Sequence, residues 1–491
     1  MKKFAIIILA IMLSFVAVSC EQSVAETKDS ESAAVTIKKD AEELKPVKVV
    51  FDLKKPSDIV FDIGLEEDEE LICLEGENVA DGDYIVSDGK LFVKREYWTT
   101  LKGGEHVFKV VTTKNEKKLS FDIDAENKDN NIVNGGFETG DLFGWTAYTI
   151  FKGEDDILSF VDEGVKENDT FFTFEVPYGG KGKYVYGFDD RDGDNKDKWN
   201  ERMGVMRSST FVLGGCGFVS FMLGGGKNGQ LCYLSVRDAE TDEEIARYKN
   251  EKFNSTSYIL DEENYYEANL VSYKADLSAH LGKKLYFEFV DLGGRDWDLL
   301  TFDEIVSYHK TEPETGVLAK DIKPTFTDSY VPNVLYNGDL SKGLEGYSEF
   351  SASSSNESVF TVANGVLKSD AQGDEGRGTL RSSLFRVDGS GIISMNVGAA
   401  QGKRFDKDTF ISIRERNTNR ELFRFANRNH DGNTMIRYYV DLSEHIGKQC
   451  YIEIVDNAAG SYDVIFVSDI ITYYASMPVY GLDNAAVNLV Y

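Results

Sequence analysis

The segment at 294–298 of this sequence, GRDWD, combines residue types that can bind a sugar. The indole of Trp297 offers an apolar face on which the CH groups of a sugar ring can stack, and Arg295 and Asp296 can hydrogen-bond to hydroxyl groups. Trp199, beside a run of acidic residues, offers a second ring of this kind. We expect these residues to line a binding face for a neutral sugar, unless Trp297 is a core residue and the loop around Trp199 is only solvated.

Two further candidates, Arg207 and Asp291, belong to a set of charged residues that occurs twice along the chain. A guanidinium group and a carboxylate each have planar, bidentate geometry and can bind a pair of sugar hydroxyls. The same pairing can be an internal salt bridge that holds strands together, and for Arg207 and Asp291 both interpretations stay open. A structural role is favoured for the other recurring charged residues: Arg237 and Arg414, Arg247 and Arg424, and Glu288 and Glu453.

The composition excludes several classes of function. Five His and five Cys, the latter without paired spacing, leave little material for a zinc site or a His-based catalytic triad. The formal net charge of −30 repels the phosphates of nucleic acids, so we expect no nucleic-acid partner. An aromatic content of 12%, with 44 Gly against 7 Pro, is typical of a folded, β-rich protein and not of a disordered acidic chain.

The first twenty residues have the layout of a secretory signal peptide, with two lysines, an apolar run from Phe4 to Val18, and then Cys20. The ending AVSC resembles the lipobox of bacterial lipoproteins, which implies that Cys20 becomes the lipidated first residue of the mature chain. The alternative is an ordinary signal peptide with an incidental Cys. Residues 21–46 are polar and lack aromatic residues, so we expect them to tether a chain that is lipid-anchored to the cell membrane at the cell surface.

The segment 47–125 has many short apolar runs separated by Gly, Asp and Asn turns, a density that predicts an immunoglobulin-like (Ig-like) sandwich. Its stretch DGDYIVSDGKLFVKREYWTTLKGGEHVFKVV resembles the X-two module, a carbohydrate-binding Ig-like domain of secreted bacterial polysaccharide hydrolases. The resemblance implies either a sugar-binding module or a spacer.

Two long segments, 131–310 and 331–475, repeat each other. GVMRSSTFVLGGCGFVSFMLGG of the first matches GTLRSSLFRVDGSGIISMNVGA of the second at a constant offset of 174 residues. We expect two copies of one domain, joined by a linker at 311–330 and followed by a tail at 476–491.

Within each copy the apolar runs alternate with a period of two, and helical periodicity is nearly absent. Glu288 is therefore expected on one face of a strand, and Phe287 and Phe289 on the other. Asp276 and Asp441 each begin a short DLS turn that we expect to be one helical turn, capped by the Asp and ended by a Gly. Both copies are expected to be antiparallel sandwiches of jelly-roll type.

The opening NGGFETGDLFGW, the centre RSSTFVLGGCGFVSFMLGGG and the closing FVDLGGRDWDLLTFDEIVSY of the first copy resemble known accessory modules. These are the galactose-binding-domain-like sandwiches appended to fructan hydrolases of glycoside hydrolase family 32. The catalytic part of that family is missing here, because the sequence has no WMNDPNG-like nucleophile motif and no Glu-Cys acid motif. We therefore expect no catalytic residue and no enzyme activity.

The same resemblance implies a structural calcium ion, held by acidic residues from the first and last strands, here Glu138 and Asp303. In the second copy these positions hold Ser341 and Ser468. Both carboxylates are lost together, as expected if they share one ion, although Asp339 and Asp469 lie one or two positions away and could replace them. The alternative is two solvated carboxylates.

Together these observations predict an all-β chain, an Ig-like sandwich followed by two jelly-roll sandwiches, that binds polysaccharide without cleaving it. β-Fructans such as levan or inulin are the ligands that the family resemblance implies. The other expected partners are the membrane, through the N-terminal lipid, and a separately encoded glycoside hydrolase or transporter. The alternatives are a structural or adhesive surface spacer, the accessory part of a glycoside hydrolase whose catalytic domain is absent from this chain, and, on weaker grounds, glycoside hydrolase activity of the chain itself.

Overall fold

The structure is a computed structural model of the 491-residue chain. It describes residues 42–123, 128–149, 158–168, 171–173, 176–177, 179–187, 203–252, 270–293, 298–352, 357–399, 409–427, 434–458 and 464–479. The expected signal peptide with Cys20, nearly all of the tether and most of the tail lie outside the described residues. Within these ranges no helix has the length and apolar character needed to cross a membrane.

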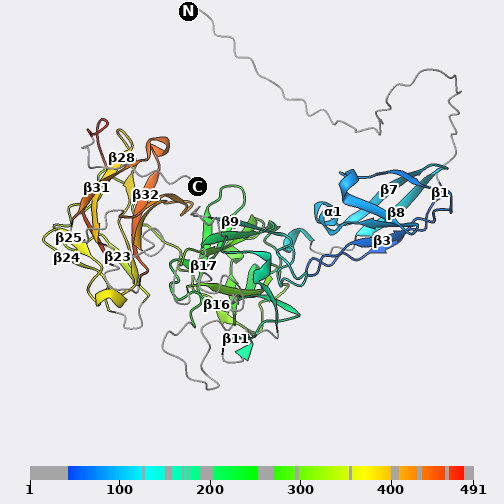
Figure 1. Cartoon of the computed structure of the whole chain (residues 1–491), viewed down its shortest axis with the longest axis horizontal. Helices are drawn as coiled ribbons and strands as arrows, with labels where there is room; N and C mark the ends of the chain where they lie inside the picture. Colours follow the sequence, from blue (N-terminus) through cyan, green and yellow to red (C-terminus); the bar gives the residue numbers. More distant parts are fainter. Residues whose placement is uncertain are drawn as a thin grey trace, which may run out of the picture. The chain divides into compact units, whose positions relative to one another are not determined.

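The described chain is built almost wholly of β-strands, with a single α-helix and a few 3-10 turns (Figure 1). The expected all-β class is therefore confirmed. The chain divides into two compact units. One unit contains the residues up to Phe51 and Asp58–Ala125, and the other contains Asp52–Ser57 and the residues from Glu126 onward.

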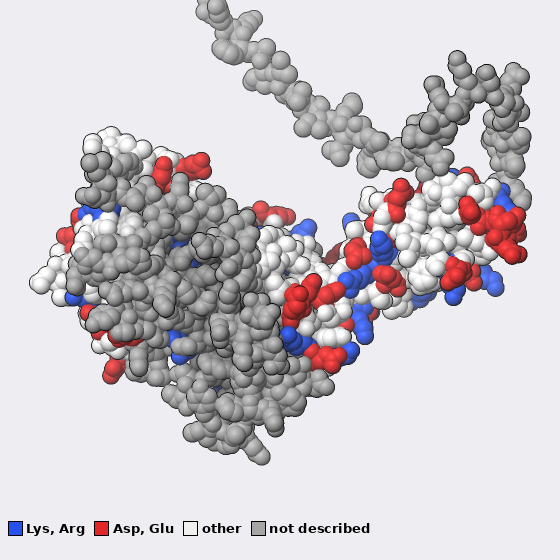
Figure 2. Space-filling model, viewed as in Figure 1, with Lys and Arg blue, Asp and Glu red and all other residues white. Residues whose placement is uncertain are grey.

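The first unit contains two sheets, with strand orders β1-β8-β7-β4, in which β2 also pairs with β8, and β3-β6-β5. Its elements are β1 Glu42–Glu43, β2 Val47–Val49, β3 Ile59–Asp62, β4 Leu71–Glu75, η1 Asp81–Asp83, β5 Tyr84–Ser87, β6 Lys90–Val93, α1 Arg95–Thr100, β7 Gly104–Thr112 and β8 Glu116–Ile123. Acidic and basic side chains are interspersed over the face of this unit that Figure 2 shows. The acidic excess of the chain is therefore not gathered into one patch on that face.

The core of the first unit is aromatic and connects its two sheets. Phe61 of β3 lies with its ring centroid 6.1 Å from that of Phe108 in β7 and 5.8 Å from that of Phe121 in β8. Trp98 of α1 is fully buried among these rings, and its Nε1 donates to the carbonyl oxygen of Val93. The helix therefore contributes a large apolar side chain to the core between the two sheets.

In the second unit, the first jelly roll (β9 to β22) contains two sheets. One has the strand order β18-β17-β20-β14-β9, with β15 also paired to β20, and the other has the order β10-β13-β21-β16-β19-β22. The strands β11 and β12 form a separate pair. Its elements are η2 Lys128–Asn130, β9 Trp145–Thr149, η3 Asp162–Gly164, β10 Val165–Glu167, β11 Phe171–Thr173, β12 Val176–Pro177, β13 Tyr184–Tyr186, β14 Gly204–Ser208, β15 Phe211–Val212, β16 Phe218–Gly225, β17 Cys232–Asp238, β18 Glu244–Tyr248, β19 Val271–Asp276, η5 Ser278–His280, β20 Lys284–Asp291, β21 Leu300–Val306 and β22 Val317–Leu318.

The second jelly roll (β23 to β33) has the sheet orders β30-β29-β32-β26-β23, with β27 also on β32, and β24-β25-β33-β28-β31. Its elements are β23 Ser348–Ser351, β24 Thr361–Ala363, β25 Val366–Lys368, η6 Gly373–Glu375, β26 Gly378–Arg381, β27 Phe385–Arg386, β28 Ile392–Ala399, β29 Thr409–Glu415, β30 Glu421–Phe425, β31 Ile436–Asp441, η7 Ser443–His445, β32 Gln449–Asp456 and β33 Ile465–Ile471. Apart from β22 and the pair β11-β12, which have no counterpart among the described residues of the second jelly roll, this order equals that of the first, so the sequence repeat is a repeat of topology.

A short helical turn forms in both copies as expected, but its N-cap residue is Leu277 or Leu442 and not the Asp. The Oδ1 of Asp276 accepts a hydrogen bond from the amide of Ser278 at 2.9 Å, and Asp441 does the same for Ser443. Each pair begins a single 3-10 turn, η5 or η7. The turns lead to Gly282 and Gly447, whose φ values of +82° and +93° lie in the region that favours glycine. These turns set the direction from which β20 and β32 enter their sheets.

Candidate functional site

One sheet of the first jelly roll, β18-β17-β20-β14-β9, carries charged residues on the face away from the core. In β20, Glu288 alternates with Phe287 and Phe289, which belong to the core. Strand pairing places Arg207 of β14 and Ser235 of β17 directly opposite Glu288. The expected alternation of faces in this strand is therefore present.

The second jelly roll repeats this pattern on its equivalent sheet. Glu453 of β32 lies opposite Arg381 of β26 and Ser412 of β29. Phe410 and Val455 on the same face join the buried cluster of the first jelly roll. The two charged faces therefore pack against each other.

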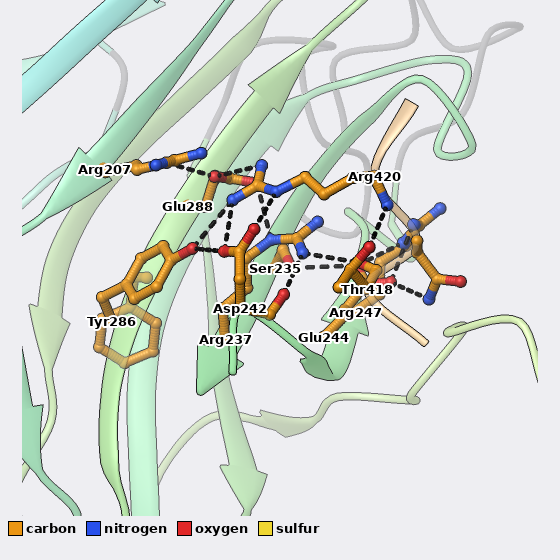
Figure 3. A network of polar contacts seen from close by, with 12 residues as sticks. Arg207, Ser235, Arg237, Asp242, Glu244, Arg247, Tyr286, Glu288, Thr418 and Arg420 are labelled. Carbon is orange, nitrogen blue, oxygen red and sulfur yellow. Dashed lines mark hydrogen bonds and ion pairs between the residues drawn. The ribbon is translucent and has the colours of Figure 1, made fainter. Parts of the chain in front are cut away.

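Arg420, which directly precedes β30, makes the densest contacts between the two jelly rolls (Figure 3). Its Nη1 donates to both carboxylate oxygens of Glu288 at 2.8 and 2.9 Å. Its Nε and Nη2 donate to the two carboxylate oxygens of Asp242 at 2.8 Å each. Nη2 also donates to the hydroxyl of Tyr286 at 2.9 Å. One guanidinium group of the second jelly roll is thus bound by three side chains of the first.

Neighbouring residues of the same turn add further contacts. The Nη1 of Arg237 donates to the carbonyl oxygen of Thr418 at 2.6 Å, and the Nδ2 of Asn419 donates to Glu244 at 2.5 Å. Arg247 also binds Glu244, through Nε at 2.8 Å. Arg237, Arg247 and Glu288 therefore have the structural role that we expected for them.

These residues form one polar network, which we call the arginine cluster. Among the described residues its carboxylates are Asp242, Glu244, Glu288, Glu421 and Glu453. Its guanidinium groups are those of Arg207, Arg237, Arg247, Arg381, Arg414, Arg420 and Arg424.

The guanidinium groups hold the carboxylates of the cluster in the ionised form. Burial alone raises the pKa of Glu288, but the charges of Arg237, Arg420 and Arg207 bring it below its ordinary value. For Glu244, burial is likewise outweighed by Arg247 and Arg237, and its pKa falls to about 2. At neutral pH these carboxylates are therefore acceptors and not proton donors.

A pocket of about 270 Å³, the junction pocket, opens in the arginine cluster between the two jelly rolls. Its charged walls are formed by Arg207, Arg237, Arg414, Arg420, Glu288 and Glu421. Tyr148 of β9 lies on its rim and is 44% exposed. The volume is at the small end of the range for ligand pockets, which is about 300–1,000 Å³.

Arg207 is the predicted sugar-binding residue that the structure places at this pocket. Its side chain is 35% exposed, and its Nε donates to Glu288 at 2.7 Å. Its guanidinium carbon lies 5.0 Å from the ring centroid of Tyr148 and 5.6 Å from that of Tyr286. The ion pair that the sequence left open is therefore present, the side chain stays partly exposed at the pocket, and sugar binding by Arg207 stays a prediction.

Asp291 lies elsewhere, on the core side of the same strand. It is only 2% exposed, and it accepts a weak hydrogen bond from the thiol of Cys232. Burial and the nearby charge of Asp298 raise the pKa of Asp291. This environment favours the structural interpretation of Asp291 over direct contact with a sugar.

The other predicted sugar-binding residues, Trp199, Arg295, Asp296 and Trp297, lie outside the described residues, so the loop site stays a prediction. Asp298, which follows that loop, is described and buried. Its Oδ1 accepts a hydrogen bond from the amide of Asn228 at 2.7 Å.

The two predicted calcium ligands lie at one loop. Asp303 of β21 accepts a hydrogen bond from the amide of Lys181 at 2.6 Å, and Glu138 accepts one from the amide of Lys183 at 2.8 Å. Gly180 and Gly182 allow this close approach, because a Cβ at either position would collide with one of the carboxylates. Within the described ranges, however, no group of three or more His, Cys, Asp or Glu residues is arranged to hold a metal. The pair fits part of a calcium site, and calcium stays a prediction.

Arg420, Asp242 and Tyr148 are site residues that the sequence reasoning missed. Arg420 corresponds to Glu243 in the first copy, at the offset of 177 residues that relates the two hairpins. A reversal of charge at one position of an otherwise similar hairpin was the signal that could have drawn attention to it.

Comparison with known proteins finds no family model and no curated protein that matches the chain. Among solved structures, the K3 adhesin domain of Lys-gingipain from Porphyromonas gingivalis aligns with 13% identity and a TM-score of 0.21, over 28% of this chain and 97% of that domain. The secreted serine protease VesC from Vibrio cholerae aligns with 12% identity and a TM-score of 0.21, over 61% of this chain and 57% of that protein. A CBM51-2 domain in complex with GlcNAc, with INT domains, from Clostridium perfringens ZmpB aligns with 9% identity and a TM-score of 0.15. That alignment covers 54% of this chain and 47% of the other. The chain thus spans about half the length of VesC and of the ZmpB fragment.

Proposed function

We propose that this chain is a non-catalytic polysaccharide-binding protein of the bacterial cell surface. The observation that carries the proposal is the junction pocket, where the exposed ring of Tyr148 lies beside the guanidinium group of Arg207. An aromatic face and planar hydrogen-bonding groups together match the CH-rich faces and the hydroxyls of a sugar. Both side chains project from paired strands, β9 and β14, which hold them in a fixed relation.

The chemistry of the pocket supports binding without cleavage. Glycoside hydrolysis needs a protonated carboxylic acid beside a second carboxylate. Glu288, which lines the pocket, accepts hydrogen bonds from Arg207, Arg237 and Arg420, and its pKa is below the ordinary value. It therefore lacks the proton that a general acid has to donate.

The finer parts of the proposal come from the sequence. The resemblance to accessory modules of family 32 hydrolases makes β-fructans such as levan or inulin the first ligands to test, in a role accessory to glycoside hydrolysis. Lipidation at Cys20 would hold the chain at the membrane. Several weak sites on one anchored chain would then retain a polymer through their combined effective concentration.

Affinity electrophoresis of the mature chain, residues 21–491, in gels containing levan, inulin, pectin, xylan or starch tests the proposal. We expect at least one polysaccharide to retard the chain. The substitution Tyr148→Ala should remove the retardation, whereas Tyr330→Ala, at a tyrosine that is 76% exposed away from the pocket, should leave it unchanged.

If no polysaccharide retards the chain, the binding proposal is wrong and a structural or adhesive spacer takes its place. Release of reducing sugar from any polysaccharide in the panel would contradict the absence of catalysis.

A further inference from the structure

The charges of the arginine cluster do not balance. Among the described residues it contains seven guanidinium groups and five carboxylates. Most of these side chains are buried, and buried charges are costly unless each has a partner. Each guanidinium group has a carboxylate partner, but the described residues of the cluster carry two more positive than negative charges, in a chain whose formal net charge is −30.

The described lining of the junction pocket also has more guanidinium groups than carboxylates. Four of the seven arginines line it, against two of the five carboxylates. Arg237 and Arg414 are almost completely buried, and Arg420 is engaged by Glu288 and Asp242. Among the described residues, Arg207 contacts a carboxylate through Nε alone. Its two Nη groups are therefore the donors that can serve a ligand, and Figure 3 shows Arg207 at the margin of the network.

We propose that the junction pocket binds a saccharide that carries a carboxylate, such as a uronic acid unit. The carboxylate would lie on the Nη groups of Arg207, and the sugar ring would lie against Tyr148. This inference rests on the proposed glycan-binding function and names its ligand class. A bidentate guanidinium–carboxylate pair supplies both charge and direction, and it neutralises part of the positive excess. A neutral β-fructan offers no such group.

The site is composite. Tyr148 and Arg207 come from the first jelly roll, and Arg420 closes the pocket from the second while it occupies Glu288. Glu288 accepts from Arg237 and Arg420 as well as from Arg207, and it binds Arg207 through Nε. When the two jelly rolls pack together, the pocket forms around Arg207, and its two Nη groups can donate to a ligand there.

Isothermal titration of the mature chain with oligogalacturonate and with its fully methyl-esterified form tests the proposal, because the two share one backbone and differ in charge. We expect the acidic oligomer to bind at least about tenfold more tightly, and its affinity to fall as salt rises. Arg207→Gln should lower the affinity for the acidic oligomer about tenfold. The matched control Arg386→Gln, at an exposed arginine paired with Asp388, should not.

Failure of the acidic ligand class and failure of glycan binding give different results. If the ester, levan or inulin binds as tightly as the acid, the ligand class is wrong while glycan binding stands. If an acidic oligomer binds with equal affinity to wild type and Arg207→Gln, the pocket is wrong. If no acidic or neutral saccharide binds, both proposals fail. Glu288 retains Arg237 and Arg420 in the variant, so the variant should fold, and a thermal melt checks this.

Discussion

Asp298 and Glu244 are both buried carboxylates of the first jelly roll, yet their pKa values are shifted in opposite directions. Glu244 lies between two arginines and has a pKa of about 2. Asp298 is buried near the carboxylate of Asp291, and burial raises its pKa to about 6 although Arg377 and the amide of Asn228 oppose the rise. The partners that each carboxylate meets, and not burial alone, therefore decide which protonation state the fold favours.

Asp298→Asn should flatten the pH dependence of stability between about pH 4 and pH 6. The folded-state pKa of Asp298 is above the ordinary value of 3.8, so its stabilising contribution is complete below about pH 4 and is lost as pH rises through about 6. The loss is on the order of 3 kcal/mol. Urea unfolding at a series of pH values measures it. Parallel curves for the variant and wild type would contradict the assignment, and the exposed Asp328→Asn is the control.

Single substitutions can also test whether Glu138 and Asp303 bind calcium. If Glu138 and Asp303 share an ion, calcium at about 100 times its Kd should raise the melting temperature by roughly 5 °C over EDTA. Glu138→Gln should abolish the difference, and the exposed Glu444→Gln should keep it. A melting temperature that is the same with calcium and with EDTA would remove calcium from the proposal.

At the scale of elements, equivalent hairpins of the two jelly rolls have different roles. The β17–β18 turn contributes Asp242, whose carboxylate accepts hydrogen bonds. The β29–β30 turn contributes Arg420, whose guanidinium group donates them to Asp242. The strand pairings around both turns, including an irregular step just before each turn, are the same. The backbone repeat is thus conserved between the copies while the side chains at the turn have diverged.

Arg420→Ala should lower the free energy of unfolding by about 3 kcal/mol, because it leaves Glu288 and Asp242 with fewer partners in a largely buried setting. Urea unfolding followed by circular dichroism measures the change. Arg386→Ala, at an exposed ion pair, should cost less than about 1 kcal/mol. Equal losses in the two variants would mean that Arg420 has no special part in joining the jelly rolls.

Much of this arrangement could be predicted from local pattern. The period of two around Glu288 placed it on the opposite face from Phe287 and Phe289. The match between the two copies, at an offset of 174 residues, implied that they share a strand order. The partners of Glu288 could not be predicted in this way. Arg420 lies 132 residues away in the sequence, and no periodicity within one strand encodes a contact between two sheets.

At the scale of the whole molecule, the expected lipid anchor and the two jelly rolls would act together. A chain held at the membrane meets an extracellular polymer at high effective concentration, so modest affinity at each site is sufficient for retention. In this proposal, retention at the membrane would depend on Cys20, the predicted lipidation site, and glycan binding would depend on the fold.

Cys20→Ala should move the protein from the detergent phase to the aqueous phase in detergent partitioning, and it should abolish incorporation of labelled fatty acid. Glycan binding by the soluble variant should be unchanged, because the junction pocket lies far along the chain from residue 20. Detergent partitioning that is unaffected by the substitution would show that Cys20 is incidental to an ordinary signal peptide.

We expect the difference between Arg420 and Glu243 to limit self-association as well. If the docking of the two jelly rolls were repeated in reverse, the equivalent contact would bring Glu243 against Glu453, two groups of the same sign. Arg420 already occupies Glu288 within its own chain. Among the described residues this contact is therefore satisfied within one chain, and we expect it not to propagate into a filament of chains.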